Sequence, residues 1–63
     1  GYKRYEGESD DELIYRVTGD KEKIGSWNDV AEILNSLLGT SYTESKFRKA
    51  RQEFNRMFKA NQS

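Results

Sequence analysis

The pattern of apolar and polar positions along the chain predicts helices rather than strands. No run of residues alternates between apolar and polar side chains, and no Asn-Gly turn separates two β-branched segments, so a sheet is not expected. The first helix is predicted over residues 10–18, because Ser9 and Glu12 have the spacing of a capping box. Gly19 is predicted to close this helix with a positive φ angle.

Two further helices are predicted from apolar residues that recur at one-face spacing. The second covers residues 27–38, with the stripe Trp27, Val30, Ala31, Leu34, Leu37 and Leu38. The third and longest covers residues 44–59, with Phe47, Ala50, Phe54, Met57 and Phe58 predicted to face the core. The expected fold is therefore all-α, a three-helix bundle.

The predicted helices define one domain over residues 9–60, followed by a polar tail over 61–63. Residues 1–8 are interpreted as a flexible arm or the remnant of a tag, because the chain begins with Gly1 rather than Met. Tyr2 or Tyr5 is expected to pin this arm to the core.

Composition removes most catalytic chemistry from consideration. The 63 residues include no Cys and no His, which excludes a zinc finger, a thiol nucleophile and a Ser-His-Asp triad. The acidic run Asp10, Asp11 and Glu12 fits the first turn of a helix better than a metal site. We therefore expect neither an enzyme nor a bound cofactor or metal.

Charge is segregated along the chain although the formal net charge is zero. Residues 43–63 hold six basic and two acidic side chains, whereas the preceding residues are net acidic. On a helical wheel, the face opposite the apolar stripe of the third helix is cationic and amide-rich. Its members and flanks are Ser45, Arg48, Lys49, Gln52, Asn55, Arg56 and Lys59, with Glu53 at one border.

Side chains of these types are the ones that proteins use to read duplex DNA. Arg and Lys donate to phosphates and to guanine, and Gln can bond adenine with two hydrogen bonds. Arg51 lies nearer the core and is expected to pair with an acid of the first or second helix. The candidate DNA contacts are Lys46, Lys49, Gln52 and Arg56 in the groove, Thr43 and Ser45 near the helix N-terminus, and Arg48 and Lys59 at phosphates.

A structural explanation competes with this interpretation. Any helix at the surface of a protein needs a polar outer face, and Lys and Arg are strong helix formers that suit the C-terminal half of a helix. The short connection between the second and third helices favours the DNA interpretation, because it has the plan of a helix-turn-helix with the third helix as recognition helix.

The residues that carry this plan resemble the trihelical Myb/SANT or homeodomain-like group. Trp27 opens the second helix and is followed by Val30 and Ala31, as in Myb-like repeats. The resemblance covers about residues 12–58, although Myb repeats tend to have three tryptophans and this chain has one. The chain is also similar in its general residue pattern to short DNA-binding segments of bacteriophage and prophage proteins. The resemblance implies binding of double-stranded DNA by insertion of the third helix into the major groove.

Two alternatives of the same fold remain. A SANT-like module binds another protein, here through Tyr15 and Arg16 of the first helix, and a phage assembly module packs its basic helix on an acidic partner.

No apolar run approaches the roughly 20 residues of a membrane span, so we expect no membrane contact and a cytoplasmic location, in a bacterial or phage-infected cell. Target sequence and oligomeric state stay open.

Overall fold

The computed structural model describes the backbone of residues 1–62 and the side chains of residues 1–59. Within this range the chain is all-helical, and its elements are α1 (Asp10–Thr18), α2 (Lys21–Ile24), α3 (Trp27–Leu38) and α4 (Glu44–Gln62). The helices predicted over 10–18 and 27–38 are confirmed as α1 and α3. The third predicted helix is α4, which continues past the predicted end at Lys59. Ser63 of the predicted tail lies outside the described residues.

The short helix α2 was not predicted, so the described chain has one helix more than the expected bundle. It forms because Gly19 does not close α1 in the expected way. Gly19 has a φ of −65° in the right-handed helical region, and the backbone turns directly into α2. The positive φ lies instead at Gly25, which ends α2 with a φ of 114°.

A small core joins α1, α3 and α4. Its fully buried apolar side chains come from all three helices, and half-buried Trp27 packs against them. The buried apolar residues are Leu13, Val17, Val30, Ala31, Leu34 and Phe47. The Ser9 capping box is present in full, with Glu12 donating its backbone N–H to the Ser9 hydroxyl and accepting from the Ser9 N–H in return. The start of α1 predicted from the capping box is therefore the start that the structure shows, and α1 contributes Leu13 and Val17 to the core.

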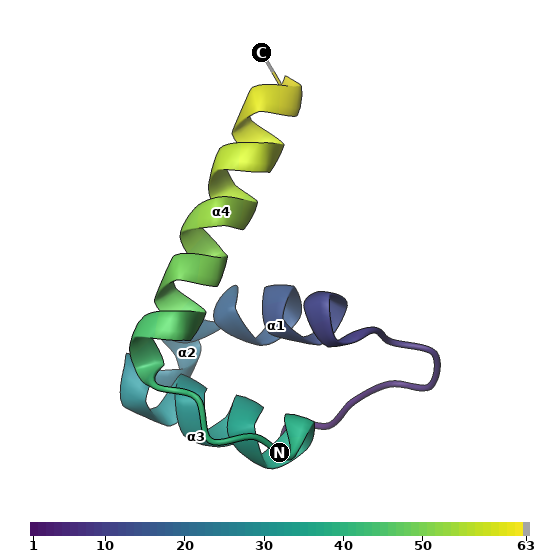
Figure 1. Cartoon of the computed structure of the whole chain (residues 1–63), viewed down its shortest axis with the longest axis vertical. Helices are drawn as coiled ribbons and strands as arrows, with labels where there is room; N and C mark the ends of the chain where they lie inside the picture. Colours follow the sequence, from purple (N-terminus) through teal and green to yellow (C-terminus); the bar gives the residue numbers. More distant parts are fainter. Residues whose placement is uncertain (63) are drawn as a thin grey trace.

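The core ends well before α4 does. Figure 1 shows α4 rising past α1, with its second half projecting away from the other helices. Phe47 is buried and Phe54 is half-buried, but Met57 and Phe58 are 56% and 43% exposed. The prediction that all of these residues face the core is therefore wrong for Met57 and Phe58, because the buried core meets α4 at Phe47 and the Tyr15 ring of α1 covers Phe58 on one side without burying it.

Residues 1–8 fold back onto the helices. Tyr2 packs against the core and donates its hydroxyl to Asp20 at 3.0 Å. The Arg16 guanidinium binds Glu8 through two hydrogen bonds, of 2.8 and 2.9 Å, and lies 4.2 Å from the centre of the Tyr5 ring. Arg16 thus fastens this segment to α1.

The Glu8–Arg16 pair makes the attachment of residues 1–8 sensitive to acid. The hydrogen bond from Arg16 lowers the pKa of Glu8 from 4.5 to about 2. Because the folded-state pKa is depressed, the stabilisation is present above about pH 4.5 and is lost as the pH falls toward 2. We expect the melting temperature to drop over this interval, and we expect part of that drop to disappear in Glu8→Gln. Thermal melts followed by circular dichroism between these pH values measure it.

Glu6→Gln is the matched control for this prediction, because it removes the same charge from an exposed neighbour that has no ion pair among the described side chains. The control is expected to keep the acid dependence of the parent chain. If Glu8→Gln and the parent chain lose stability in parallel as the pH falls, the pair does not hold the segment in place.

Candidate nucleic-acid interface

The face of α4 turned away from the core carries the predicted contact residues. All of them are exposed, and Thr43 lies immediately before the helix while the others lie on it: Thr43, Ser45, Lys46, Arg48, Lys49, Gln52, Arg56 and Lys59. Ser45, Arg48, Lys49 and Gln52 line a shallow hollow of about 190 Å³. The helix thus brings cations, an amide and a hydroxyl together on one open surface.

Carboxylates of α4 itself do little to neutralise this surface. Arg48 lies 3.8 Å from Glu44 and Arg56 lies 3.8 Å from Glu53, and in both pairs the side chains are more than one-third exposed. Exposed pairs of this length contribute little, about 0–1 kcal/mol, and exchange readily with other anions. Lys49 has no carboxylate within ion-pair distance among the described side chains. The face therefore remains available to a polyanion.

The turn between α3 and α4 is held by one amide side chain. Asn35 donates to the carbonyl of Tyr42 at 2.8 Å, and its oxygen accepts from the backbone N–H of Tyr42 and from the hydroxyl of Thr40. Gly39 ends α3 with a φ of 70°, in the left-handed region that favours glycine. These contacts fix the direction in which α4 leaves α3. The sequence reasoning did not single out Asn35.

Lys46, at the first turn of α4, lies over an aromatic ring. Its ammonium is 4.5 Å from the centre of the Tyr42 ring, and that ring in turn packs edge-on against Phe47. The contact orients Lys46 beside the turn while leaving it exposed.

Arg51 ties α4 to α1, but not through an acid. Its guanidinium donates to the carbonyl of Tyr15 at 2.9 Å and lies 4.8 Å from the centre of the Tyr15 ring. The expected acidic partner is thus wrong, because the Tyr15 carbonyl in the last turn of α1 accepts from this cation in addition to the Gly19 backbone N–H. A Cβ on Gly19 would lie 3.1 Å from the Arg51 guanidinium, so glycine leaves the room for this approach.

The comparison with family models assigns the whole chain to one family. The model described as the YonJ N-terminal domain matches residues 1–63. The chain belongs to this family. No curated protein and no solved structure is significantly similar to it.

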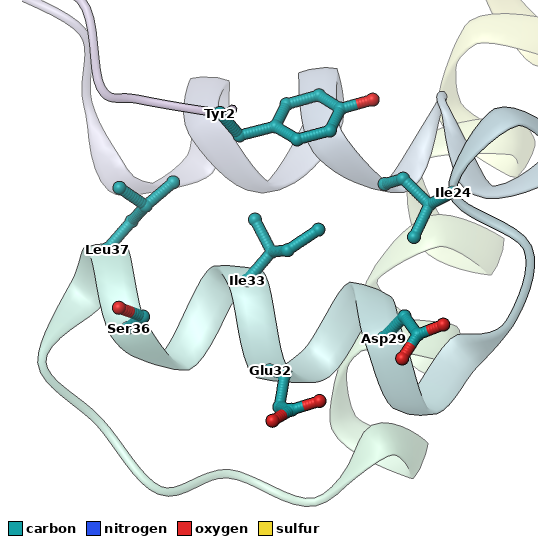
Figure 2. A pocket seen from close by; sticks show the side chains of 7 residues that line it. All are labelled: Tyr2, Ile24, Asp29, Glu32, Ile33, Ser36 and Leu37. Atoms are coloured by element: carbon teal, nitrogen blue, oxygen red, sulfur yellow. The ribbon is translucent and has the colours of Figure 1, made fainter.

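A second surface of this YonJ N-terminal domain is a groove between residues 1–8, the end of α2 and the outer side of α3. Figure 2 shows Ile24, Ile33 and Leu37 pointing toward Tyr2, with Asp29 and Glu32 along the outer edge of α3. The space measures about 610 Å³. The groove has an apolar floor of Ile24, Ile33 and Leu37. Its border of Asp29 and Glu32 is acidic, and residues 26–42 contain no Lys or Arg to balance these charges.

A third surface is aromatic. Tyr15 packs edge-on against Phe54 and Phe58, with ring centres 5.4 and 5.1 Å apart, and Met57 lies beside them in the sequence. Tyr15 was expected to share a protein-binding surface with Arg16, but in the structure Arg16 binds Glu8. It assigned Phe54, Met57 and Phe58 to the core and therefore missed this patch.

Among the described residues, no group of three or more His, Cys, Asp or Glu side chains is arranged to hold a metal ion. None of the helices over the described range combines the length and hydropathy that a membrane crossing requires.

Proposed function

We propose that the domain binds double-stranded DNA with α4 as its recognition helix. The observation that carries the proposal is the open cationic face of α4, on which all the candidate contacts are exposed and none is covered by another described helix. An α-helix of this kind fits the major groove, where Arg, Lys and Gln reach base edges and phosphates.

The arrangement of α3, turn and α4 supports this use. In a helix-turn-helix of the Myb or homeodomain-like type, the second helix of the motif is presented by a short turn and a shared core. Here Asn35 fixes the turn, Phe47 anchors the first half of α4 in the core, and Arg51 ties it to α1. A rigidly held helix loses less entropy when it enters a groove.

Charge distribution gives a second argument. The cations concentrate on residues 43–63, and the acids concentrate on the rest of the chain. A domain polarised in this way orients in the field of DNA with its basic helix toward the duplex. Gln52 lies within the cationic face and offers the amide that reads adenine, while Ser45 lies near the start of α4.

Titration of a random-sequence duplex, followed by fluorescence anisotropy, tests the proposal. If about four cations meet phosphates, the logarithm of the association constant falls with the logarithm of salt concentration at a slope near −3.5. In nuclear magnetic resonance spectra, shifts on DNA addition are expected to concentrate on residues 43–59. Absence of binding at low salt, or a slope near zero, contradicts DNA binding.

A protein-interaction module of the SANT-like kind is the second candidate. The apolar groove with its Asp29 and Glu32 border favours it, because that surface suits a peptide with aliphatic and basic side chains. The same spectra separate the two functions. A DNA reader shows shifts on α4 with duplex, whereas an interaction module shows none with duplex and shows shifts at Ile33 and Leu37 with a basic amphipathic peptide.

A further inference from the structure

The exposed aromatic patch identifies a separate interaction surface. It consists of Tyr15 on α1 and Phe54, Met57 and Phe58 on α4, of which Tyr15 is 40% exposed. Large apolar side chains that are this open and lie together usually mark a protein interface. Met57 and Phe58 lie beyond the buried core, and the Tyr15 ring covers Phe58 on one side while the other side stays open.

The patch lies in a notch between the outer side of α1 and the projecting half of α4. The notch encloses about 470 Å³ and is lined by the rings of Tyr15, Phe54 and Phe58. Figure 1 shows α4 rising at an angle from beside one end of α1, the two helices whose side chains line the notch. Its α1 side also carries acids, of which Asp11 is exposed and has no ion pair among the described side chains.

The projecting half of α4 has the complementary properties. Phe54, Met57 and Phe58 follow the i, i+3, i+4 spacing of a helix–helix seam. After Glu53 the chain contains no further acid, and Lys59, which follows Phe58 directly, is a cation at the flank of the cationic face. The end of one α4 therefore suits the notch of another copy in both apolar and electrostatic character.

We propose that two copies of the chain associate through this patch, with their α4 helices antiparallel. In that arrangement the aromatic stripes of the two α4 helices face each other, and the cationic end of each α4 reaches the acidic outer side of the partner's α1. A two-fold axis satisfies both contacts at once, because each copy supplies one notch and one helix end. Lys59 is shared with the proposed DNA contacts, whereas Phe58 and Asp11 are not, so Phe58→Glu and Asp11→Lys test pairing separately from DNA binding.

Sedimentation velocity over a concentration series tests the pairing. We expect the mass to rise from 7.4 kDa toward twice that value between roughly 10 µM and 1 mM, the range of modest interfaces. Phe58→Glu places a carboxylate in the seam and is expected to keep the chain monomeric. Tyr42→Ser is the matched control, since Tyr42 is 44% exposed but lies away from the patch, and it is expected to associate like the parent chain.

A charge exchange tests the arrangement without altering the apolar seam. Asp11→Lys and Lys59→Glu are each expected to weaken self-association at least tenfold, because each sets like charges against each other across the interface. An equimolar mixture of the two variants restores opposite charges at both contacts, and we expect it to associate as the parent chain does. Circular dichroism melts show whether each variant is folded, and an unfolded variant is replaced by Asp11→Asn or Lys59→Gln, with the same direction of effect.

The outcomes divide clearly. Association of the parent chain that Phe58→Glu abolishes and the mixture restores supports the antiparallel pair. A parent chain that stays monomeric at 1 mM overturns the proposal, and so does association that Phe58→Glu leaves unchanged. Association without rescue in the mixture overturns the antiparallel arrangement.

Discussion

Phe47→Ala is expected to remove about half or more of the free energy of unfolding of the domain at 25 °C. The Phe47 side chain is fully buried where α4 meets α1 and α3, and removal of a buried phenyl ring costs about 3–5 kcal/mol. A domain of 63 residues has a total free energy of unfolding of about 3–9 kcal/mol, so one such cavity removes much of it. Urea titration followed by circular dichroism and by Trp27 fluorescence measures the change, because Trp27 is the single tryptophan and packs against the core.

Met57→Ala is the matched control, since Met57 lies on the same helix and the same apolar arc but is 56% exposed. We expect its free energy of unfolding to change by less than about 1 kcal/mol. Equal losses for the two variants would show that the projecting half of α4 is packed as firmly as the first half. Measurements at low concentration keep self-association out of the comparison.

The difference in burial between Phe47 and Phe58 shows what sequence periodicity can and cannot predict. Both residues fall on one face of the wheel, and the wheel is right about that face. Periodicity does not report how far the neighbouring helices extend along α4, which depends on the crossing of α1 and α4. The nine-residue helix α1 meets Phe54 and Phe58 at its Tyr15 side chain, and this contact leaves Phe58 43% exposed.

Helix boundaries were predictable where capping residues are unambiguous. Ser9 starts α1 as expected, Ser26 caps the predicted start of α3 with its side chain, and Gly39 ends α3 with a positive φ. Gly19 was also predicted to end its helix with a positive φ, and this prediction is wrong. The absence of a side chain at Gly19 instead leaves room for the Arg51 guanidinium. A glycine can serve either purpose, and only the tertiary contact separates them.

The candidate interface was predictable because it depends on a single helix. Polar and apolar faces of α4 follow from sequence spacing, and the exposure of Lys49, Gln52 and Arg56 agrees with it. The contacts that orient α4 were not predictable. Asn35 acts across the turn and Arg51 acts on α1, and such long-range contacts leave no local pattern in the sequence.

The double variant Lys49→Gln, Arg56→Gln is expected to lose DNA affinity and salt sensitivity together. Each phosphate contact contributes about 0.9 to the slope of log K against log salt, so two lost contacts change the slope from about −3.5 to about −1.7. If the two proteins bind equally at about 1 M salt, the same relation predicts an affinity about 200-fold lower at about 50 mM salt. Anisotropy titrations of one duplex at several salt concentrations give both quantities.

Lys3→Gln, Lys23→Gln is the control of equal charge, because both lysines are exposed and lie outside α4. If net charge alone attracts DNA, the two double variants weaken binding equally, and the proposed role of α4 is wrong.

Gln52→Ala adds a separate test within the cationic face of α4. Since a neutral amide releases no counterion, this variant is expected to leave the slope unchanged and to lower affinity by about 1–3 kcal/mol only on duplexes whose adenine it contacts. A slope that changes with Gln52→Ala would mean that the amide holds the helix in place instead of reading a base.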